Sequence, residues 1–471
     1  MAVSRACARA LGSFLASSEV SYPWADLDVP SPFLLGGDWF WGCVVDQSVV
    51  NENVQGSVAE NSAAQETAAQ ETVADPAASA KVDSANAQGS AAGSSDKAAA
   101  EAMYLKTLMN IIGLWKGPQV VRVGGEGMWE SDLHHTGLQG KLPHYIFNLH
   151  SLETLDLSAN SFIGNIPSEI SVDITHLIYL NLGRNKLNGT LPSWLFTSPS
   201  LKILHLSHNM LSGNVPFESF ALPSLKELYL GHNQLVGDID RQTFSKLTNL
   251  TDLRLSYNKF SGEWELGTLL KTLTKLEYLD LSYNGLSVTA KNDNHYVKPG
   301  FRYLGLASCK LKVFPPSICN MSYLSYLDIS NNSIGGIIPE CVIFGSRYIE
   351  GLILKGNRLE GEVPHSLSKC RSLKVLDLGN NKLNGTFPEW LGGLSNLQVL
   401  LLKSNNFHGP IGISTAIKHA FSHLHVLDLS HNWFVGKLPG KYFQNFKAMQ
   451  KMVSHSTYPE YLSVGQLEEL G

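Results

Sequence analysis

One sixteen-residue pattern recurs along most of the chain and constrains its fold more than any other feature. The segments LETLDLSANSFIGNIP (152–167), LIYLNLGRNKLNGTLP (177–192), LKILHLSHNMLSGNVP (201–216) and LKVLDLGNNKLNGTFP (373–388) share the template L-x-x-L-x-L-x-x-N-x-L-x-G-x-[IVL]-P. Alignment on the template Asn gives thirteen repeats, spaced about 25 residues apart. A fixed period of this length is typical of a solenoid, in which each unit packs only against its neighbours.

The template also predicts what holds each repeat together. The leucines of LxLxxN alternate along a short strand, so stacked repeats form a parallel sheet over a leucine core. The Asn follows the strand, where its amide can donate to and accept from backbone groups that the turn leaves unpaired. Thr136 and Cys309 are smaller polar substitutes at this position. The predicted structural row is Asn160, Asn185, Asn209, Asn233, Asn258, Asn284, Asn332, Asn357, Asn381, Asn405 and Asn432.

The composition changes sharply before the repeats. Residues 49–102 contain no aromatic residue, Leu or Ile and are rich in Ala, Ser, Gln and Glu, so we expect a disordered linker. The predicted organisation is an N-terminal segment of uncertain structure (1–48), this linker (49–102), a transition segment (103–128), the repeat domain (129–440) and a non-repeat tail (441–471).

Charge and hydropathy bear on several functional classes. A formal net charge of -5 and a pI near 6.3 give no electrostatic basis for binding nucleic acid. The sequence lacks a run of about 18 apolar residues, the length of a transmembrane helix. The first twenty residues, MAVSRACARALGSFLASSEV, hold only a short and interrupted apolar run. A secretory signal needs roughly 7–15 continuous apolar residues, so secretion stays open.

The G-x-[IVL]-P half of the template resembles the plant-specific class of leucine-rich repeat. Longer stretches such as LASCKLKVFPPSICNMSYLSYLDISNNSIGGIIP and HLHVLDLSHNWFVGKLPGKYFQNFKAM are similar to plant receptor-like proteins. The resemblance implies an α/β-type leucine-rich repeat solenoid, a right-handed superhelical horseshoe with a parallel β-sheet on the concave face and irregular or 3-10 segments on the convex face. It also implies a plasma-membrane or extracellular location, a peptide, protein or glycan ligand, and a co-receptor kinase as partner.

The sequence departs from that family at both ends. The usual N-terminal cap, with paired cysteines and a tryptophan, is not recognisable, although DWFWGCVV has the residue types. YFQNFKAM (442–449) resembles the start of the family's non-repeat island, and the sequence stops at Gly471 within it. We therefore expect a truncated or misassembled gene product as one alternative.

Residues between the template leucines face solvent on the concave side. In repeats ten to twelve the inner positions are small or aliphatic: Gly351, Ile353, Val375, Val399 and Leu401. In repeats three to nine many of them are large with polar tips, as in many binding hot spots, although sheet propensity alone also favours tyrosine there. The predicted ligand-binding residues are Tyr179, Arg184, His205, His208, Tyr229, His232, Arg254, Tyr257, Tyr278, Tyr283, Tyr303 and Tyr326.

The favoured function is a ligand-binding ectodomain that acts in plant defence or developmental signalling. The alternatives are a secreted inhibitor similar to polygalacturonase-inhibiting proteins and a fragment with no ligand. No HExxH, GxSxG, P-loop or kinase signature occurs, so we expect neither an enzyme nor a cofactor.

Two patterns suggest metal chemistry but have simpler explanations. His205 and His208 form an H-x-x-H pair, which is a legitimate metal motif. Their opposite parity on the strand places them on different rows, and His232 and His431 share the slot of His208, which indicates a permissive turn position. A carboxylate recurs at the middle strand position and is expected to be structural: Asp156, Asp280, Asp328, Asp377 and Asp428.

The cysteines and sequons leave two modifications open. The six cysteines make no C-x-x-C pattern, and Cys309 and Cys319 could form a disulfide in an oxidising compartment. Five N-x-S/T sequons permit glycosylation at Asn188, Asn249, Asn320, Asn331 and Asn384.

Overall fold

The chain divides into two units, 1–93 and 94–471, and every described residue lies in the second. The structure, a computed structural model, describes residues 121–124, 128–148, 152–170, 174–215, 220–239, 244, 246–290, 300–341, 348–412 and 417–450. The N-terminal segment and linker predicted for 1–102 lie outside these ranges, as do most of the transition segment and the tail beyond residue 450.

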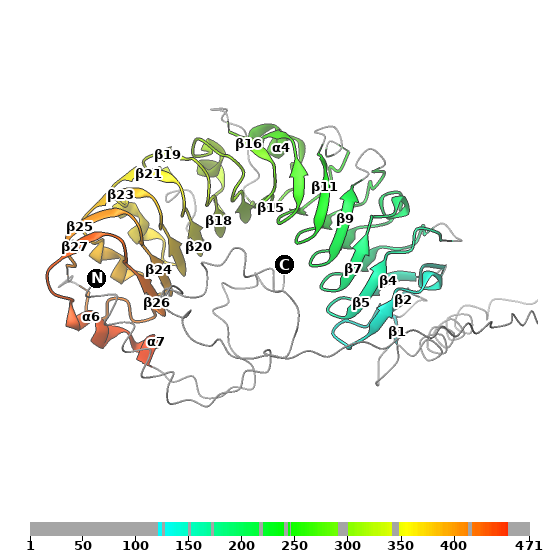
Figure 1. Cartoon of the computed structure of the whole chain (residues 1–471), viewed down its shortest axis with the longest axis horizontal. Helices are drawn as coiled ribbons and strands as arrows, with labels where there is room; N and C mark the ends of the chain where they lie inside the picture. The colour runs from blue at the N-terminus through cyan, green and yellow to red at the C-terminus, as the bar shows by residue number, and fades with distance from the viewer. Residues whose placement is uncertain are drawn as a thin grey trace, which may run out of the picture. The chain divides into compact units, whose positions relative to one another are not determined.

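Each repeat contributes one short strand to a parallel sheet that follows the inner side of an arc (Figure 1). A further strand, β1, pairs antiparallel with β2 at the N-terminal edge. The sheet confirms the predicted horseshoe with its concave parallel strands. In order the strands are β1 (Val121–Gly124), β2 (Met128–Asp132), β4 (Leu152–Asp156), β6 (Tyr179–Asn181), β8 (Ile203–His205), β10 (Glu227–Tyr229), β12 (Asp252–Arg254), β15 (Tyr278–Asp280), β17 (Tyr303–Gly305), β18 (Tyr326–Asp328), β20 (Gly351–Ile353), β22 (Val375–Asp377), β24 (Val399–Leu401) and β26 (Val426–Asp428).

The segment after each template Asn forms strands of its own, where the sequence pattern suggested only a bend around the outer edge. They make further parallel sheets along the arc, because the same few backbone groups of successive repeats lie in register. One sheet contains β3 (Gln139–Lys141), β5 (Ser161–Asn165), β7 (Lys186–Gly189), β9 (Met210–Asn214), β11 (Gln234–Asp238) and β13 (Lys259–Ser261). Another contains β19 (Gly335–Gly336), β21 (Arg358–Gly361), β23 (Lys382–Gly385), β25 (Asn406–Pro410) and β27 (Trp433–Val435), and β14 (Glu263–Glu265) pairs with β16 (Ser287–Thr289).

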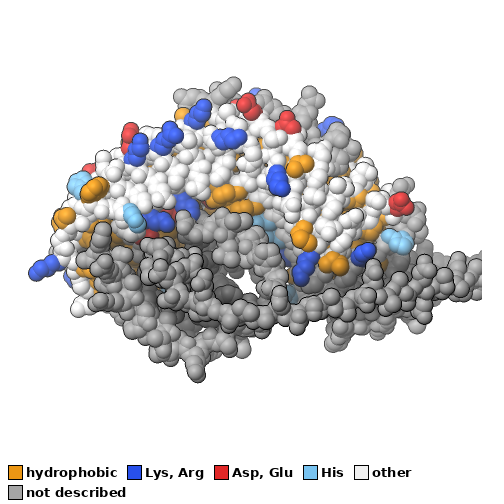
Figure 2. Space-filling view, in the orientation of Figure 1, with side chains coloured by type: hydrophobic (Ala, Val, Ile, Leu, Met, Phe, Trp, Pro, Cys, Tyr) orange, Lys and Arg blue, Asp and Glu red, His pale blue; other side chains and the backbone are white. Residues whose placement is uncertain are grey.

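Short helices complete the convex side. Most are 3-10 helices that begin just after the template Pro, which cannot continue a preceding hydrogen-bonded segment. They are η3 (His144–Asn148), η4 (Ser193–Phe196), η6 (Pro316–Asn320), η7 (His365–Lys369) and η8 (Glu389–Gly393), with α4 (Leu266–Thr272), α6 (Gly440–Asn445) and α7 (Lys447–Gln450) as α-helices. Figure 2 shows charged side chains of both signs spread along the outer part of the arc.

The template asparagines form a continuous row of hydrogen bonds beneath the concave strands. In repeat three, the Asn185 side-chain oxygen accepts the backbone N–H of Phe162 at 3.0 Å. Its Nδ2 donates to the carbonyls of Leu157 at 2.9 Å and of Leu182 and Gly183 at 3.1 Å. One amide thus joins two repeats, and the same pattern recurs at Asn160, Asn209, Asn233, Asn258, Asn284, Asn332, Asn357, Asn381, Asn405 and Asn432.

The two substitutes reproduce part of this bonding. The Thr136 hydroxyl donates to the Leu133 carbonyl at 2.8 Å. The buried Cys309 thiol lies 3.5 Å from the carbonyls of Leu281 and Ala307, where a template Asn would place its amide nitrogen.

The disulfide suggested for Cys309 and Cys319 is wrong. Cys319, at the end of η6, is bonded to Cys341. Cys309 is a free thiol inside the core, because it occupies the Asn position and points toward the backbone carbonyls rather than the convex side. Cys370 is also free and buried.

Candidate functional site

The candidate site is the concave strip, which we define as the outward side chains of the strands and following turns in repeats three to nine. It extends over seven strands, from β6 to β18. Each strand presents two outward positions on either side of a buried leucine, as Ile203 and His205 flank Leu204. A third position, three residues after the second, lies in the turn. All twelve predicted ligand-binding residues occupy one of these three positions.

At the N-terminal end of the strip, Tyr179 and Asn181 of β6 meet Asp156 of β4, the strand before the strip begins. The Tyr179 hydroxyl donates to a carboxylate oxygen of Asp156 at 2.9 Å. The Asn181 amide donates to the same oxygen at 3.0 Å and lies 3.2 Å from the Tyr179 hydroxyl. Burial, together with the neighbouring Asp156 charge, raises the pKa of Tyr179. These contacts hold the tyrosine ring upright on the sheet.

The middle of the strip is a stack of rings and charges. The His205 and Tyr229 rings are parallel, with centroids 3.9 Å apart. The Arg254 guanidinium lies 4.5 Å from the Tyr229 ring centroid and 5.4 Å from that of Tyr278, both distances at which a cation is attracted to an aromatic face. The strip is therefore continuous from β8 to β15.

Two carboxylates lie at the edges of this stack. Glu227 is 3.2 Å from Nε2 of His205, and this contact lowers the pKa of Glu227. Asp252 accepts a hydrogen bond from the Tyr229 hydroxyl at 3.3 Å and lies 3.7 Å from Arg254. The sequence analysis interpreted Asp156 as structural and did not select Asn181, Glu227 or Asp252, although all four occupy the same outward positions as the residues it selected.

The C-terminal end of the strip combines two tyrosines with two aspartates. The Tyr303 and Tyr326 rings are parallel, with centroids 5.1 Å apart. In the adjacent column Gly305 separates Asp280 from Asp328 in the strand register. Burial raises the pKa of both carboxyls, to about 6 for Asp328. Each also accepts the backbone N–H two residues on, which explains why Asp recurs at this position.

The turn position has a left-handed backbone in every repeat. Its φ is 56° at His208, 53° at Tyr257 and 54° at His431. The sequence pattern indicated a permissive position, and seven residue types do occupy it, but its left-handed backbone is costly for β-branched residues. None of its thirteen occupants is Val, Ile or Thr: His135, Ala159, Arg184, His208, His232, Tyr257, Tyr283, Ser308, Asn331, Gly356, Asn380, Ser404 and His431.

Four turn residues form a second stack parallel to the first. The rings of His208, His232, Tyr257 and Tyr283 lie parallel in succession, with centroids 4.1, 4.3 and 4.5 Å apart. The Tyr283 hydroxyl accepts a hydrogen bond from the Asn331 amide at 3.1 Å, across the intervening repeat. Burial and the neighbouring His208 and Arg184 lower the pKa of His232 to about 3, so this ring is neutral at ordinary pH.

His205 and His208 thus belong to different stacks, as their parity predicted. His205 faces Tyr229 on the strand row and His208 faces His232 on the turn row. Among the described residues, no group of three or more His, Cys, Asp or Glu side chains is arranged to hold a metal ion.

Repeats ten to twelve present a different concave surface. Gly351, Ile353 and Val375 are buried, and Val399 and Leu401 are half-buried. The Tyr326 ring lies over Gly351, where a β-carbon would collide with it. The row of polar-tipped rings therefore ends at β18.

The five sequons differ in accessibility. Asn188, Asn320 and Asn384 are exposed. Asn249 is half-buried and donates its amide to the Pro223 carbonyl at 2.8 Å. The Asn331 amide is the group that bonds Tyr283.

Comparison with known families supports the reading of the repeats. Models described as leucine-rich repeat match residues 150–211, 213–260, 272–289, 323–343, 347–407 and 423–445. Receptor-like protein 41 of Arabidopsis thaliana is 32% identical over 271 residues, which is 48% of this chain and 30% of that protein. Receptor-like protein 50 of the same plant is 46% identical over 147 residues, 31% of this chain and 16% of that protein. The chain therefore spans less than a third of the length of these relatives.

Solved structures of plant receptor ectodomains have the same repeat fold. The ectodomain of the Arabidopsis receptor kinase GASSHO1/SCHENGEN3, in complex with CASPARIAN STRIP INTEGRITY FACTOR 2, superposes with a TM-score of 0.55 and 31% identity, covering 66% of this chain and 36% of that one. The Arabidopsis receptor kinase HAESA, in complex with the peptide hormone IDA and the co-receptor SERK1, gives 0.50 and 29%, covering 66% and 55%. None of the helices in the described ranges is long and apolar enough to cross a membrane.

Proposed function

Because the repeat domain belongs to the leucine-rich repeat family of plant receptor-like proteins, we propose that its concave strip binds an extended peptide. The observation that carries this proposal is the continuous strand-row stack from His205 to Tyr278, bordered by the parallel turn-row stack. Neither stack continues into the aliphatic surface of repeats ten to twelve.

The dimensions of the strip suit a peptide. Seven adjacent strands at about 4.8 Å spacing span roughly 29 Å, which matches about nine residues of extended chain. Rings that are already stacked lose little conformational entropy when a ligand covers them, and their hydroxyl and imidazole groups can bond peptide amides.

The charges favour a ligand with basic side chains. Glu227 and Asp252 lie along the strand row, with Asp156 of β4 beside its first strand. The basic residues of the strip are Arg254, 3.7 Å from Asp252, and Arg184 on the turn row. Complementary charge accelerates encounter and rejects acidic competitors.

Signalling would follow the arrangement of the HAESA complex, which contains the co-receptor SERK1. The ligand-loaded strip would then be presented to a co-receptor kinase in defence or development. An extracellular location is supported by the Cys319–Cys341 disulfide, since such bonds persist in oxidising compartments.

The test is a binding screen of the full chain against a library of nine-residue peptides enriched in Lys and Arg. The double variant Tyr229→Ala, Arg254→Ala should weaken binding of a selected peptide at least about tenfold, since hot-spot truncation costs more than about 1.4 kcal/mol. The matched control, Val399→Ala on β24 combined with Lys403→Ala just after that strand, should change affinity less than about twofold. Equal affinity of both variants, with unchanged melting temperatures, would retire the proposal.

A further inference from the structure

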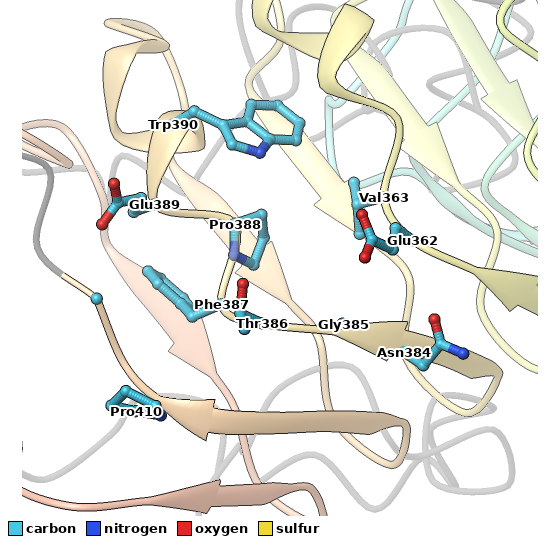
Figure 3. A pocket seen from close by; sticks show the side chains of 11 residues that line it. Glu362, Val363, Asn384, Gly385, Thr386, Phe387, Pro388, Glu389, Trp390 and Pro410 are labelled. Carbon is cyan, nitrogen blue, oxygen red and sulfur yellow. The ribbon is translucent and has the colours of Figure 1, made fainter.

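A cavity of about 350 Å³ opens on the outer part of the arc, away from the concave strip. Figure 3 shows its walls, which come from the ends of β21, β23 and β25 and the start of η8. Its size lies in the range of small-molecule sites, which typically combine apolar walls with a few convergent polar groups.

The cavity forms where one repeat departs from the template. The template Pro is present as Pro364 and Pro388 in two successive repeats, but the next repeat has Gly412 instead. The missing side chain leaves room for the carboxylate of Glu389, since a β-carbon on Gly412 would lie 2.6 Å from Oε2 of that group.

A second carboxylate lies on the other side of the cavity. The Glu362 side chain rests over Gly385, 3.1 Å from where a β-carbon would be. Figure 3 shows Glu362 and Glu389 on opposite sides of Pro388. The lining residues include no Lys, Arg or His, so the two carboxylates are not neutralised from within the cavity.

The tryptophan at the cavity edge differs from its counterpart earlier in the chain. Trp194 and Trp390 both follow the template Pro by two positions. The Trp194 indole N–H donates to the carbonyl of Pro167 at 2.8 Å. The Trp390 indole instead packs beside His365, with ring centroids 4.8 Å apart, and its N–H has no hydrogen bond to the described part of the chain.

We propose that this cavity binds a neutral saccharide of one or two residues. A half-buried indole offers an apolar face for a sugar ring and an N–H for a hydroxyl. The two carboxylates can accept hydrogen bonds from sugar hydroxyls, and the Thr386 hydroxyl can do either. The same carboxylates repel uronic acids, so the site discriminates against acidic sugars.

The saccharide has two chemically equivalent sources. The sequon Asn384-Gly385-Thr386 belongs to the lining itself, so the innermost sugars of a glycan on Asn384 can reach the cavity. A free oligosaccharide with the same neutral hydroxyl pattern is the other source. The assignment is independent of the concave strip and stands if the peptide proposal fails.

The experiment measures saccharide binding to the full chain produced in plant cells, by calorimetry and saturation-transfer NMR. The probes are N,N′-diacetylchitobiose, cellobiose and digalacturonate. We compare the native chain with Asn384→Gln, Trp390→Ala, Trp390→Phe, Glu362→Gln and the matched control Glu360→Gln, which lies two residues earlier on β21 and outside the cavity.

If a free oligosaccharide is the natural occupant, the native chain and Asn384→Gln bind a neutral disaccharide alike. If the Asn384 glycan is the occupant, only Asn384→Gln binds the free sugar. The native chain then shows magnetisation transfer between the first sugar of the Asn384 glycan and the Trp390 indole. In both cases the tryptophan variants, in the Asn384→Gln background, bind at least about tenfold more weakly, Glu362→Gln about threefold more weakly, and Glu360→Gln unchanged.

Three results overturn the proposal. The first is that neither neutral disaccharide binds to Asn384→Gln and no glycan contact reaches Trp390. The second is that binding survives Trp390→Phe and Glu362→Gln unchanged while circular dichroism shows both variants folded. The third is that digalacturonate binds as tightly as the neutral probes.

Discussion

The asparagine row and the turn-row stack run parallel along the same repeats, and they differ in how far the backbone dictates their chemistry. Beneath the strands, backbone groups of two repeats bond the side-chain amide, as for Asn185, so one residue type recurs. On the turn row the backbone imposes a left-handed φ and the stacked rings contact one another, so residue types vary within that limit. Uniformity along a repeat array therefore marks internal bonding, whereas variation marks the surface available for recognition.

The largest expected effect comes from breaking the internal row. Asn185→Ala removes one acceptor and one donor that together satisfy four buried backbone groups, so we expect the free energy of unfolding to fall by about 3–5 kcal/mol. Urea denaturation measures the change.

The control is Asn188→Ala on β7 of the same repeat, where the side chain is exposed. It should change stability by less than about 0.5 kcal/mol. An equal fall in the free energy of unfolding for both variants would mean that hydrogen bonding to the backbone does not explain why Asn recurs in the template.

A smaller effect tests whether the turn row is limited by its backbone. Tyr257→Val places a β-branched residue at φ 53° and removes two ring contacts, so we expect a loss of about 2 kcal/mol. Tyr257→Asn removes the same two ring contacts, but Asn tolerates this φ, so the loss in the free energy of unfolding should be about 1 kcal/mol smaller. If thermal melts show the two variants equally stable, the left-handed turn imposes no restriction on residue type.

The smallest effect tests a carboxylate of the concave strip. Burial raises the pKa of Asp328 to about 6 in the folded chain, above its ordinary value of 3.8, so the folded state holds the proton more tightly than the unfolded state does. The stability that comes from the neutral form is therefore present below about pH 4 and lost as the pH rises through 6. Asp328→Asn should be more stable than the native chain by about 1–2 kcal/mol at pH 8, with the difference gone by pH 4.

Denaturation midpoints across this range supply the measurement, with Asp156→Asn as a control at the same template position. A pH-independent difference at Asp328 would show that folding does not raise the pKa of its carboxyl.

Much of the fold could be predicted from the sequence, because each residue of the template has a fixed place in the strand or in its hydrogen bonds. The LxLxxN spacing determines strand, turn and amide in each repeat, and it identified even the Thr136 and Cys309 substitutes. The outer strands were missed because the Gly within each segment disfavours a strand interior. The disulfide was missed because Cys319 and Cys341 belong to different repeats, and only the stacking brings their α-carbons to 5.1 Å.

The surfaces were readable to a lesser degree. Alternation correctly placed Tyr229 and Arg254 on outward positions, and whether they bind a ligand stays a prediction. The stacking of neighbouring rings depends on side-chain rotamers that no single repeat determines. The cavity depends on a glycine in one repeat and a glutamate in the repeat before it, so a search within repeats does not reveal it.

The length of the hydrogen bond between Tyr283 and Asn331 depends on how strongly the arc is bent. The bond joins side chains 48 positions apart and passes over a whole repeat, so its length sums the tilt at two successive junctions. A ligand that tightens or opens the curvature of the solenoid would therefore change this distance by the combined tilt of two junctions. The distance between Tyr283 and Asn331 thus reports the curvature of the concave face.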